Sequence, residues 1–319
     1  MCMGLVGMEE RSISLINVIL MLFLIVFWGS SFVVVKAILR EGLGPVAIAT
    51  TRFLLAGGLF CLVLLLSRAR NRSYRVLVEK KDLLVISVLA FSGVTVFFMA
   101  QYYGIQMASA SVASILVCLL SPVLISFLSA YLFKERLSGT QFFGIGLASV
   151  GTFAVVVGGT LNLQGNLTFF LGSLILLSTP VLWAAYTLIG RKVMDKYDPF
   201  LIVAYVNILG GLFLVPFSLA EDSFRNVFAL SGQEWLAILY LAFTCSLIGY
   251  YIWFYVLKHS SAASTSSFLF AEPLVTVLFA AVFVNEEITL FALVGGLLIF
   301  FGVFLITKRR RTTESTRRS

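Results

Sequence analysis

The sequence is a succession of long apolar runs, each close to the length that a helix needs to cross a lipid bilayer. At a rise of about 1.5 Å per residue, about 20 apolar residues span the roughly 30 Å of hydrocarbon. The ten runs are residues 13–34, 44–66, 83–104, 109–133, 140–158, 169–189, 200–219, 234–256, 263–284 and 289–307. Apolar residues follow one another within them, without the alternation that strands of a membrane barrel require. We therefore expect an all-α membrane protein with ten transmembrane helices.

The composition agrees with this fold class and excludes several others. Of the 319 residues, 60% are apolar and 12% are charged, against about 45–50% and about 25% in a soluble domain. A mean hydropathy of +1.03 excludes a soluble enzyme, a disordered chain and a nucleic-acid-binding module, even with a net charge of +8. The four cysteines are far apart and there is one histidine, so we expect no disulfide framework, no metal site and no cofactor. The first run continues past Trp28 without a cleavage site, which favours a membrane anchor over a signal peptide.

The loop charges predict the orientation of the chain. With the N-terminus placed inside, nineteen of the 23 lysines and arginines fall on the inner side. Lys36, Arg40 and Arg225 fall outside, and Arg52 lies within a run. This is the positive-inside pattern, so we expect a multi-pass protein of the cell (plasma or inner) membrane with both termini cytoplasmic. Topology explains the basic stretch at 68–75 and the basic tail, and contact with lipid headgroups is the second interpretation.

The second half of the sequence repeats landmarks of the first half at an offset of 151 residues. The matching pairs are Pro122 and Pro273, Glu135 and Glu286, Gly144 and Gly295, and Gly151 and Gly302. Trp28 matches Trp183 at a slightly larger offset. We therefore expect two five-span repeats, residues 1–160 and 161–319, the second ending in a basic cytoplasmic tail. Five is odd, so the second repeat would enter the membrane from the opposite side, as in many secondary transporters. A duplicated bundle with no transport role is the alternative.

Several short motifs resemble those of the EamA-type permeases of the drug/metabolite transporter superfamily. They are Trp28-Gly29-Ser30-Ser31-Phe32, Tyr103-Gly104-Ile105-Gln106 with Ala108-Ser109-Ala110-Ser111, Ser121-Pro122, Glu135-Arg136-Leu137-Ser138 with Gln141 and Gly144, and Glu272-Pro273 with Glu286 and Gly295. The resemblance covers nearly the whole chain. It implies transport of small solutes by alternating access, often efflux of amino acids or related metabolites, through a cavity lined by spans one, three, four, six, eight and nine.

Glu272, near the middle of the ninth run, is the first candidate functional residue. An ionised carboxylate inside the membrane costs a few kcal/mol unless it is paired or hydrated. The polar residues that share its face on a regular helix are Ser261, Thr265 and Thr276. The equivalent face of the fourth run holds Ala110, Ser114 and Ser121. We expect Glu272 to bind solute and to exchange a proton for it, the alternative being a hydrogen-bonded structural acid.

Arg52 is the second charge inside the membrane, and three interpretations of it stay open. It could be the counter-ion of Glu272, an anchor for a substrate carboxylate, or a structural cation that satisfies carbonyls of neighbouring helices. The equivalent region of the seventh run holds Asn207 instead of a charge. Any role of Arg52 is therefore confined to one repeat.

Prolines and aromatic residues supply the remaining candidates. Pro122 and Pro273 would kink equivalent helices, either as hinges of two gates or as permanent bends. The expected substrate-binding residues are Trp28, Arg52, Gln101, Tyr102, Ser114, Ser121, Trp183, Tyr186, Trp253, Thr265 and Glu272. For the aromatic members, packing in the core or against lipid is the alternative.

The function expected from these features is secondary transport with membrane lipids, a small solute and protons as partners. The main alternative is an uncoupled facilitator or importer, for example of sugar conjugates or nucleobases. A membrane-embedded protein that does not transport is the less favoured one. The sequence has no HExxH, GxSxG or paired-aspartate motif, so we do not expect an enzyme.

Overall fold

The computed structural model describes residues 13–107, 110–132, 138–158, 167–284 and 290–307. These residues form helices joined by short connections, with no β-strand among them. In chain order the helices are α1 (Leu15–Arg40), α2 (Pro45–Arg70), α3 (Lys80–Ala90), η1 (Phe91–Val96), α4 (Phe97–Met107), α5 (Ala110–Leu132), α6 (Gly139–Gly158), α7 (Leu167–Val193), α8 (Pro199–Leu219), η2 (Asp222–Ala229), α9 (Gly232–Tyr240), η3 (Leu241–Gly249), α10 (Tyr250–His259), α11 (Ala262–Ser266), η4 (Ser267–Ala271), α12 (Glu272–Val284) and α13 (Leu290–Thr307). The expected all-helical fold is confirmed.

Within the described ranges, seven helical stretches are long and apolar enough to cross a membrane. They are Leu15–Arg40, Pro45–Arg70, Lys80–Met107, Phe170–Val193, Pro199–Leu219, Gly232–His259 and Ala262–Phe279. They coincide with seven of the ten apolar runs. The runs at 109–133, 140–158 and 289–307 coincide with α5, α6 and α13, in which Leu116–Leu132 and Leu293–Ile306 form shorter apolar helices.

Local sequence signals explain where several helices begin. Pro45 and Pro199 open α2 and α8, because a residue without an N–H loses no hydrogen bond in the first turn. Before α6, the N–H of Ser138 donates to Oε1 of Gln141 at 2.9 Å, and the N–H of Gln141 donates to Oγ of Ser138 at 3.2 Å. This is a reciprocal capping box.

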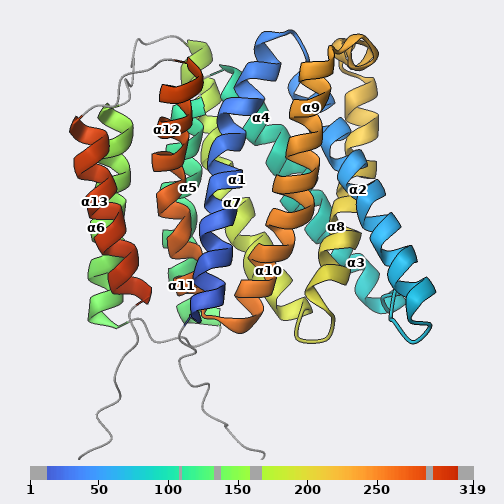
Figure 1. Ribbon diagram of the computed structural model, residues 1–319, viewed down its shortest axis with the longest axis horizontal. Helices are drawn as coiled ribbons and strands as arrows, with labels where there is room; N and C mark the ends of the chain where they lie inside the picture. The colour runs from blue at the N-terminus through green and yellow to red at the C-terminus, as the bar shows by residue number, and fades with distance from the viewer. Residues whose placement is uncertain (1–12, 108–109, 133–137, 159–166, 285–289, 308–319) are drawn as a thin grey trace, which may run out of the picture.

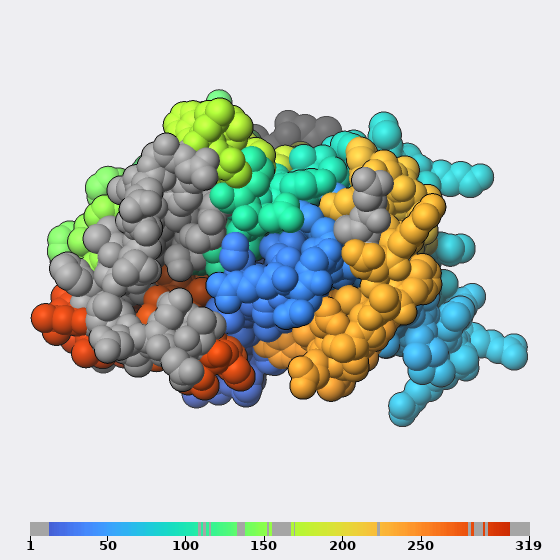
Figure 2. Space-filling view, turned by 90° about the horizontal axis from the view of Figure 1, so that it is seen from above, coloured from blue at the N-terminus to red at the C-terminus, as the bar shows by residue number. Residues whose placement is uncertain are grey.

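The helices stand side by side as one bundle (Figure 1). Helices α6 and α13 form a pair at one end of it, and the start of α1 and the end of α13 lie at the same face. Helix α2 packs against α8, α5 against α7, and α1 against α12, so the two sequence halves are interleaved. Figure 2, the view from above, shows the end of α1 near the centre of the opposite face, between α4 and the region of η2 and α9.

Helices α6 and α13 cross at glycines that are equivalent in the two repeats. A Cβ on Gly144 would lie 2.8 Å from the carbonyl oxygen of Gly302, and a Cβ on Gly151 would lie 2.6 Å from that of Gly295. Because Gly144 corresponds to Gly295 and Gly151 to Gly302, each contact is the counterpart of the other. A two-fold relation between the helices produces such reciprocal contacts, and the small residues permit the close approach.

Two π-helical segments occupy related places in the two halves. Segment η1 separates α3 from α4, and η3 separates α9 from α10. The offset between the repeats places η1 on η3. The sequence pattern did not predict either segment. Such insertions in α-helices are frequent at functional sites, and both lie directly before residues of the cavity described next.

Candidate solute-binding cavity

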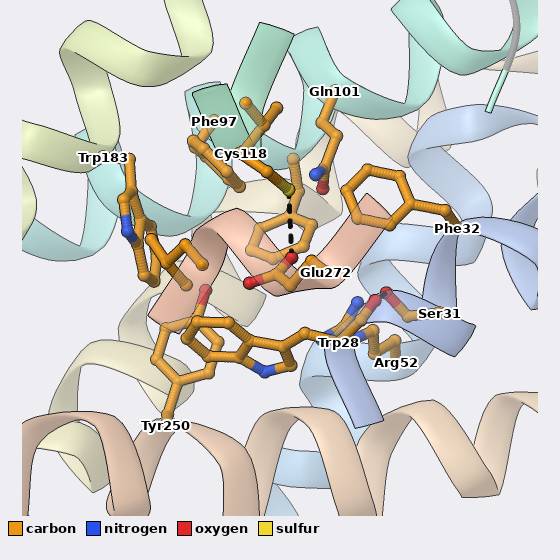
Figure 3. Close-up of a pocket in the computed structure, with 13 residues that line it drawn as sticks. Trp28, Ser31, Phe32, Arg52, Phe97, Gln101, Cys118, Trp183, Tyr250 and Glu272 are labelled. Atoms are coloured by element: carbon orange, nitrogen blue, oxygen red, sulfur yellow. Dashed lines mark hydrogen bonds between the residues drawn. The ribbon is translucent and has the colours of Figure 1, made fainter. Parts of the chain in front are cut away.

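Seven of the apolar runs surround a cavity with about 450 Å³ of space free of protein atoms. The lining residues are Trp28, Ser31, Phe32, Arg52, Phe97, Phe98, Gln101, Val117, Cys118, Trp183, Tyr250, Leu269 and Glu272 (Figure 3). They come from runs one, two, three, four, six, eight and nine, so Arg52 adds the second run to the six that the resemblance implies.

The carboxylate of Glu272 projects into this cavity (Figure 3). Glu272 opens α12, directly after the 3-10 segment η4, and is 3% exposed. Its Oε2 accepts a hydrogen bond from Sγ of Cys118 at 3.3 Å. No ion pair joins Glu272 to any lysine or arginine in the described ranges. A thiol is a weak donor, so the carboxylate retains most of its capacity to bind a proton or a cationic group.

Arg52 lines the same cavity and is also 3% exposed. Its Nε donates to Oγ of Ser246 at 2.8 Å, and its Nη1 donates to the hydroxyl of Tyr102 at 2.6 Å. The guanidinium carbon lies 4.8 Å from the ring centroid of Phe98 and 5.1 Å from that of Phe53. Arg52 therefore does not form an ion pair with Glu272 in this structure. Hydroxyl groups and aromatic faces, instead of backbone carbonyls, hold the cation.

Aromatic rings from both halves form the apolar wall. The repeat-related residues Trp28 and Trp183 meet edge to face with their ring centroids 5.3 Å apart. Tyr250 packs against both, at 5.7 Å and 5.9 Å. Nε1 of Trp28 donates to the carbonyl of Cys245 at 3.0 Å. Because Cys245 lies in η3, the π-helical segment fixes the orientation of Trp28.

Five predicted site residues line the cavity together and six do not. Those in the lining are Trp28, Arg52, Gln101, Trp183 and Glu272. Those outside it are Tyr102, Ser114, Ser121, Tyr186, Trp253 and Thr265. All six are buried.

The residues outside the lining have identifiable surroundings. Tyr102 holds Arg52, and Trp253 packs behind Trp28 with ring centroids 5.6 Å apart. The hydroxyl of Tyr186 and Oγ of Ser121 have no hydrogen-bond partner among the described residues. For Tyr186, the ring instead packs against the neighbouring Trp183, with centroids 5.4 Å apart.

The polar stripe expected along the ninth run is not continuous. The 3-10 segment η4 separates Thr265 from Glu272 and changes the rotation per residue, so the two do not share one helical face. Oγ1 of Thr265 donates to the carbonyl of Ser261 at 2.9 Å instead. The prolines also differ, because α5 continues through Pro122 whereas Pro273 follows η4. Their role as hinges stays a prediction.

Sequence reasoning did not select several residues of the lining, notably Phe97, Phe98, Cys118 and Tyr250. Three of them follow a π-helical segment: Phe97 and Phe98 come directly after η1, and Tyr250 comes directly after η3. The repeat could have indicated Cys118 as a lining residue, because Cys118 lies one helical turn before Ser121, the repeat equivalent of Glu272.

Comparison with known proteins gives the same family as the motifs. The model of the EamA-like transporter family matches residues 15–157 and 170–308, one copy in each half. An "Uncharacterized transporter" of Archaeoglobus fulgidus is 32% identical over 92% of this chain and 97% of its own length. A protein of Escherichia coli named "Probable amino-acid metabolite efflux pump" is 25% identical over 90% of this chain and 93% of its own.

A solved crystal structure shares the fold. It aligns with a TM-score of 0.74 at 19% identity and covers 91% of this chain and 96% of the other. Together with the two matched copies of the family model and relatives named as transporters or efflux pumps, not as enzymes, this similarity accounts for nearly the whole length of the sequence. The chain belongs to the EamA-like transporter family.

Proposed function

We propose that this protein is a secondary transporter that exports small metabolites, amino acids or related solutes, by alternating access. The observation that carries the proposal is the cavity that holds a buried carboxylate, Glu272, and a buried guanidinium, Arg52, between aromatic walls. Two opposite charges beside apolar rings suit a small solute with both charged and apolar parts. The name of the Escherichia coli relative supports the choice of solute class.

The topology belongs to the proposal as well. Ten helices would cross the cell membrane as two inverted five-helix repeats, with both termini in the cytoplasm. The reciprocal glycine contacts of α6 and α13 support the relation between the repeats, and the distribution of lysine and arginine supports the orientation. A reporter fused to the C-terminus should therefore be active on the cytoplasmic side only.

Glu272 is the proposed coupling residue. A carboxylate with a single thiol donor inside the membrane is stabilised by a proton or by a cationic group of the solute. If the two compete for the same oxygen atoms, release of a proton accompanies binding of solute. The carrier then exchanges protons for solute and can concentrate solute against its gradient.

The test uses purified protein in proteoliposomes. Counterflow with a panel of amino acids and related metabolites identifies a transported solute, and an imposed pH gradient then drives its accumulation. Glu272→Gln should abolish accumulation driven by the pH gradient, whereas Glu41→Gln, at an exposed carboxylate after α1, should retain it. Accumulation by Glu272→Gln equal to that of the wild type would contradict the coupling.

The alternative of an uncoupled facilitator or importer predicts a different result. Wild-type transport would then equilibrate the solute at a rate independent of the pH gradient. Sugar conjugates and nucleobases are therefore included in the panel. A fold assembled without a transport role would give no counterflow with any solute.

A further inference from the structure

Arg52 is a buried cation that forms no ion pair with any carboxylate among the described residues. An arginine remains protonated under all ordinary conditions, and a charge at this depth is costly unless it is paired. Within the described part of the chain no carboxylate lies within 4.0 Å of the guanidinium. Its neighbours are two hydroxyls and two aromatic rings, which orient the group but do not neutralise it.

The hydrogen-bonding capacity of Arg52 is only partly used. A guanidinium has about five N–H donors. One on Nε and one on Nη1 bond to Ser246 and Tyr102, and the others have no acceptor in the described ranges. Arg52 lines the cavity, so these free donors lie where a solute would bind. Planar guanidinium edges match carboxylates in particular, because two parallel N–H···O bonds can form.

We propose that Arg52 is a carboxylate-binding subsite, that Tyr102 and Ser246 position it, and that the transported solute carries a carboxylate. This inference rests on the proposed function and narrows its solute class. The carboxylate of the solute would supply a counter-charge to the guanidinium, and Tyr102 and Ser246 hold the guanidinium in a fixed orientation for this contact.

The two positioning residues come from different helices and hold different edges of the guanidinium. Tyr102 lies in α4 and holds Nη1, whereas Ser246 lies in η3 and holds Nε. The ring of Phe98 restricts the guanidinium plane further. In the second repeat, Asn207 is the polar residue in the region equivalent to that of Arg52, and it donates to the carbonyl of Val203 four residues before it. The subsite therefore belongs to one half only.

The experiment compares probes that differ only in the carboxylate. Leucine, phenylalanine and threonine are each paired with their amides, and inhibition of counterflow and thermal stabilisation give the half-saturating concentrations. Hydrogen bonds to charged groups predict that wild-type protein binds the acids at least about tenfold more tightly than the amides. Arg52→Gln should abolish this preference.

Tyr102→Phe and Ser246→Ala should each reduce the preference for the acid about three- to tenfold and leave binding of the amide unchanged. Tyr186→Phe is the matched control, because it also removes a buried tyrosine hydroxyl, but one outside the cavity lining. It should keep the wild-type preference. A purely structural role of the hydroxyls would lower thermal stability and affect acids and amides equally, which would contradict their assignment as positioning residues.

The outcomes separate this inference from the proposed function. Wild-type counterflow of amides as effective as that of acids would overturn the carboxylate subsite and leave transport intact. The subsite would also be overturned if solutes without a carboxylate bind and support counterflow while none of the acids does. Absence of counterflow with every solute of both panels would contradict the proposed transport function itself.

Discussion

Sγ of Cys118 in α5 lies 3.3 Å from Oε2 of Glu272 in α12, and this hydrogen bond joins the two repeats at the cavity. Ser121, the repeat equivalent of Glu272, lies one helical turn after Cys118, and its buried Oγ has no hydrogen-bond partner among the described residues. The two halves therefore provide unlike groups at related positions. The acidic wall belongs to the second repeat, and the first repeat supplies its hydrogen-bond donor.

Replacement of Cys118 should change how the carboxylate of Glu272 binds solute. Cys118→Ala removes the donor, and the apparent affinity for solute should change about two- to tenfold, the range of one ordinary hydrogen bond. Cys118→Ser keeps a donor of similar size and should stay close to the wild type. Counterflow measured at several pH values checks both variants. Equal behaviour of the alanine and serine variants would show that volume, not the hydrogen bond, matters at this position.

The sequence predicts those residues of the candidate cavity that are distinguished by a charge or by the internal repeat. Glu272 and Arg52 can be predicted because charges inside apolar runs are rare, and Trp28 and Trp183 because they match each other in the two repeats. Tyr250 is not among the predicted residues, although Trp253 is, because η3 changes the helix rotation immediately before Tyr250. A helical wheel assumes a uniform rotation per residue, and neither a π segment nor a 3-10 segment such as η4 has the α-helical one. Whether a segment forms an α, π or 3-10 helix depends on tertiary packing, and a local sequence pattern does not encode this packing.

Removal of a buried tyrosine hydroxyl should have different effects on solute binding at Tyr250 and at Tyr186. Tyr250 lines the cavity and Tyr186 does not, yet neither hydroxyl has a hydrogen-bond partner in the described part of the chain. Tyr250→Phe should weaken solute binding about two- to tenfold if the hydroxyl bonds to solute. Tyr186→Phe should leave transport unchanged and stabilise the protein by about 1 kcal/mol or more, because an unsatisfied polar group is removed. Counterflow and thermal unfolding of the pair provide the check, and similar transport by both variants would contradict a role of Tyr250 in binding.

Because α6 packs closely on α13, substitution by alanine should affect the stability of the protein differently at two glycines of α6, Gly151 and Gly146. A Cβ on Gly151 would lie 2.6 Å from the carbonyl oxygen of Gly295 and 2.8 Å from the backbone nitrogen of Ile299, so backbone must move. Gly151→Ala should cost about 1–3 kcal/mol of stability. Gly146 has no atom within 4 Å of the same position, and Gly146→Ala should be neutral or stabilising by about 0.5–1 kcal/mol. Unfolding midpoints in detergent measure the difference, and equal midpoints for the two variants would contradict the observed crossing.

A cluster of charges predicts how the stability of the protein varies in acid. It consists of Glu79 directly before α3, Lys81 in the first turn of α3 and Lys196 between α7 and α8. Nζ of Lys196 lies 2.7 Å from Oε2 of Glu79, and Nζ of Lys81 lies 3.0 Å from it. Hydrogen bonds from Lys196 and then Lys81 lower the pKa of Glu79 from 4.5 to about 2. A carboxylate whose folded-state pKa is depressed stabilises the fold above its unfolded pKa, and this contribution is lost as the pH falls from about 4.5 towards 2.

Glu79→Gln should therefore lower the unfolding midpoint at pH 7, and the gap to the wild type should close as the pH falls from 4.5 to 2. The effect should be small, because the side chain of Glu79 is 39% exposed and water and salt screen the pair. Raising the ionic strength at pH 7 should narrow the same gap. Glu41→Gln is the control, because it removes an exposed carboxylate that forms no ion pair among the described residues, and its unfolding midpoint at pH 7 should stay close to that of the wild type. A gap of constant size from pH 7 to pH 2 would mean that the ion pairs of Glu79 do not hold these two connections together.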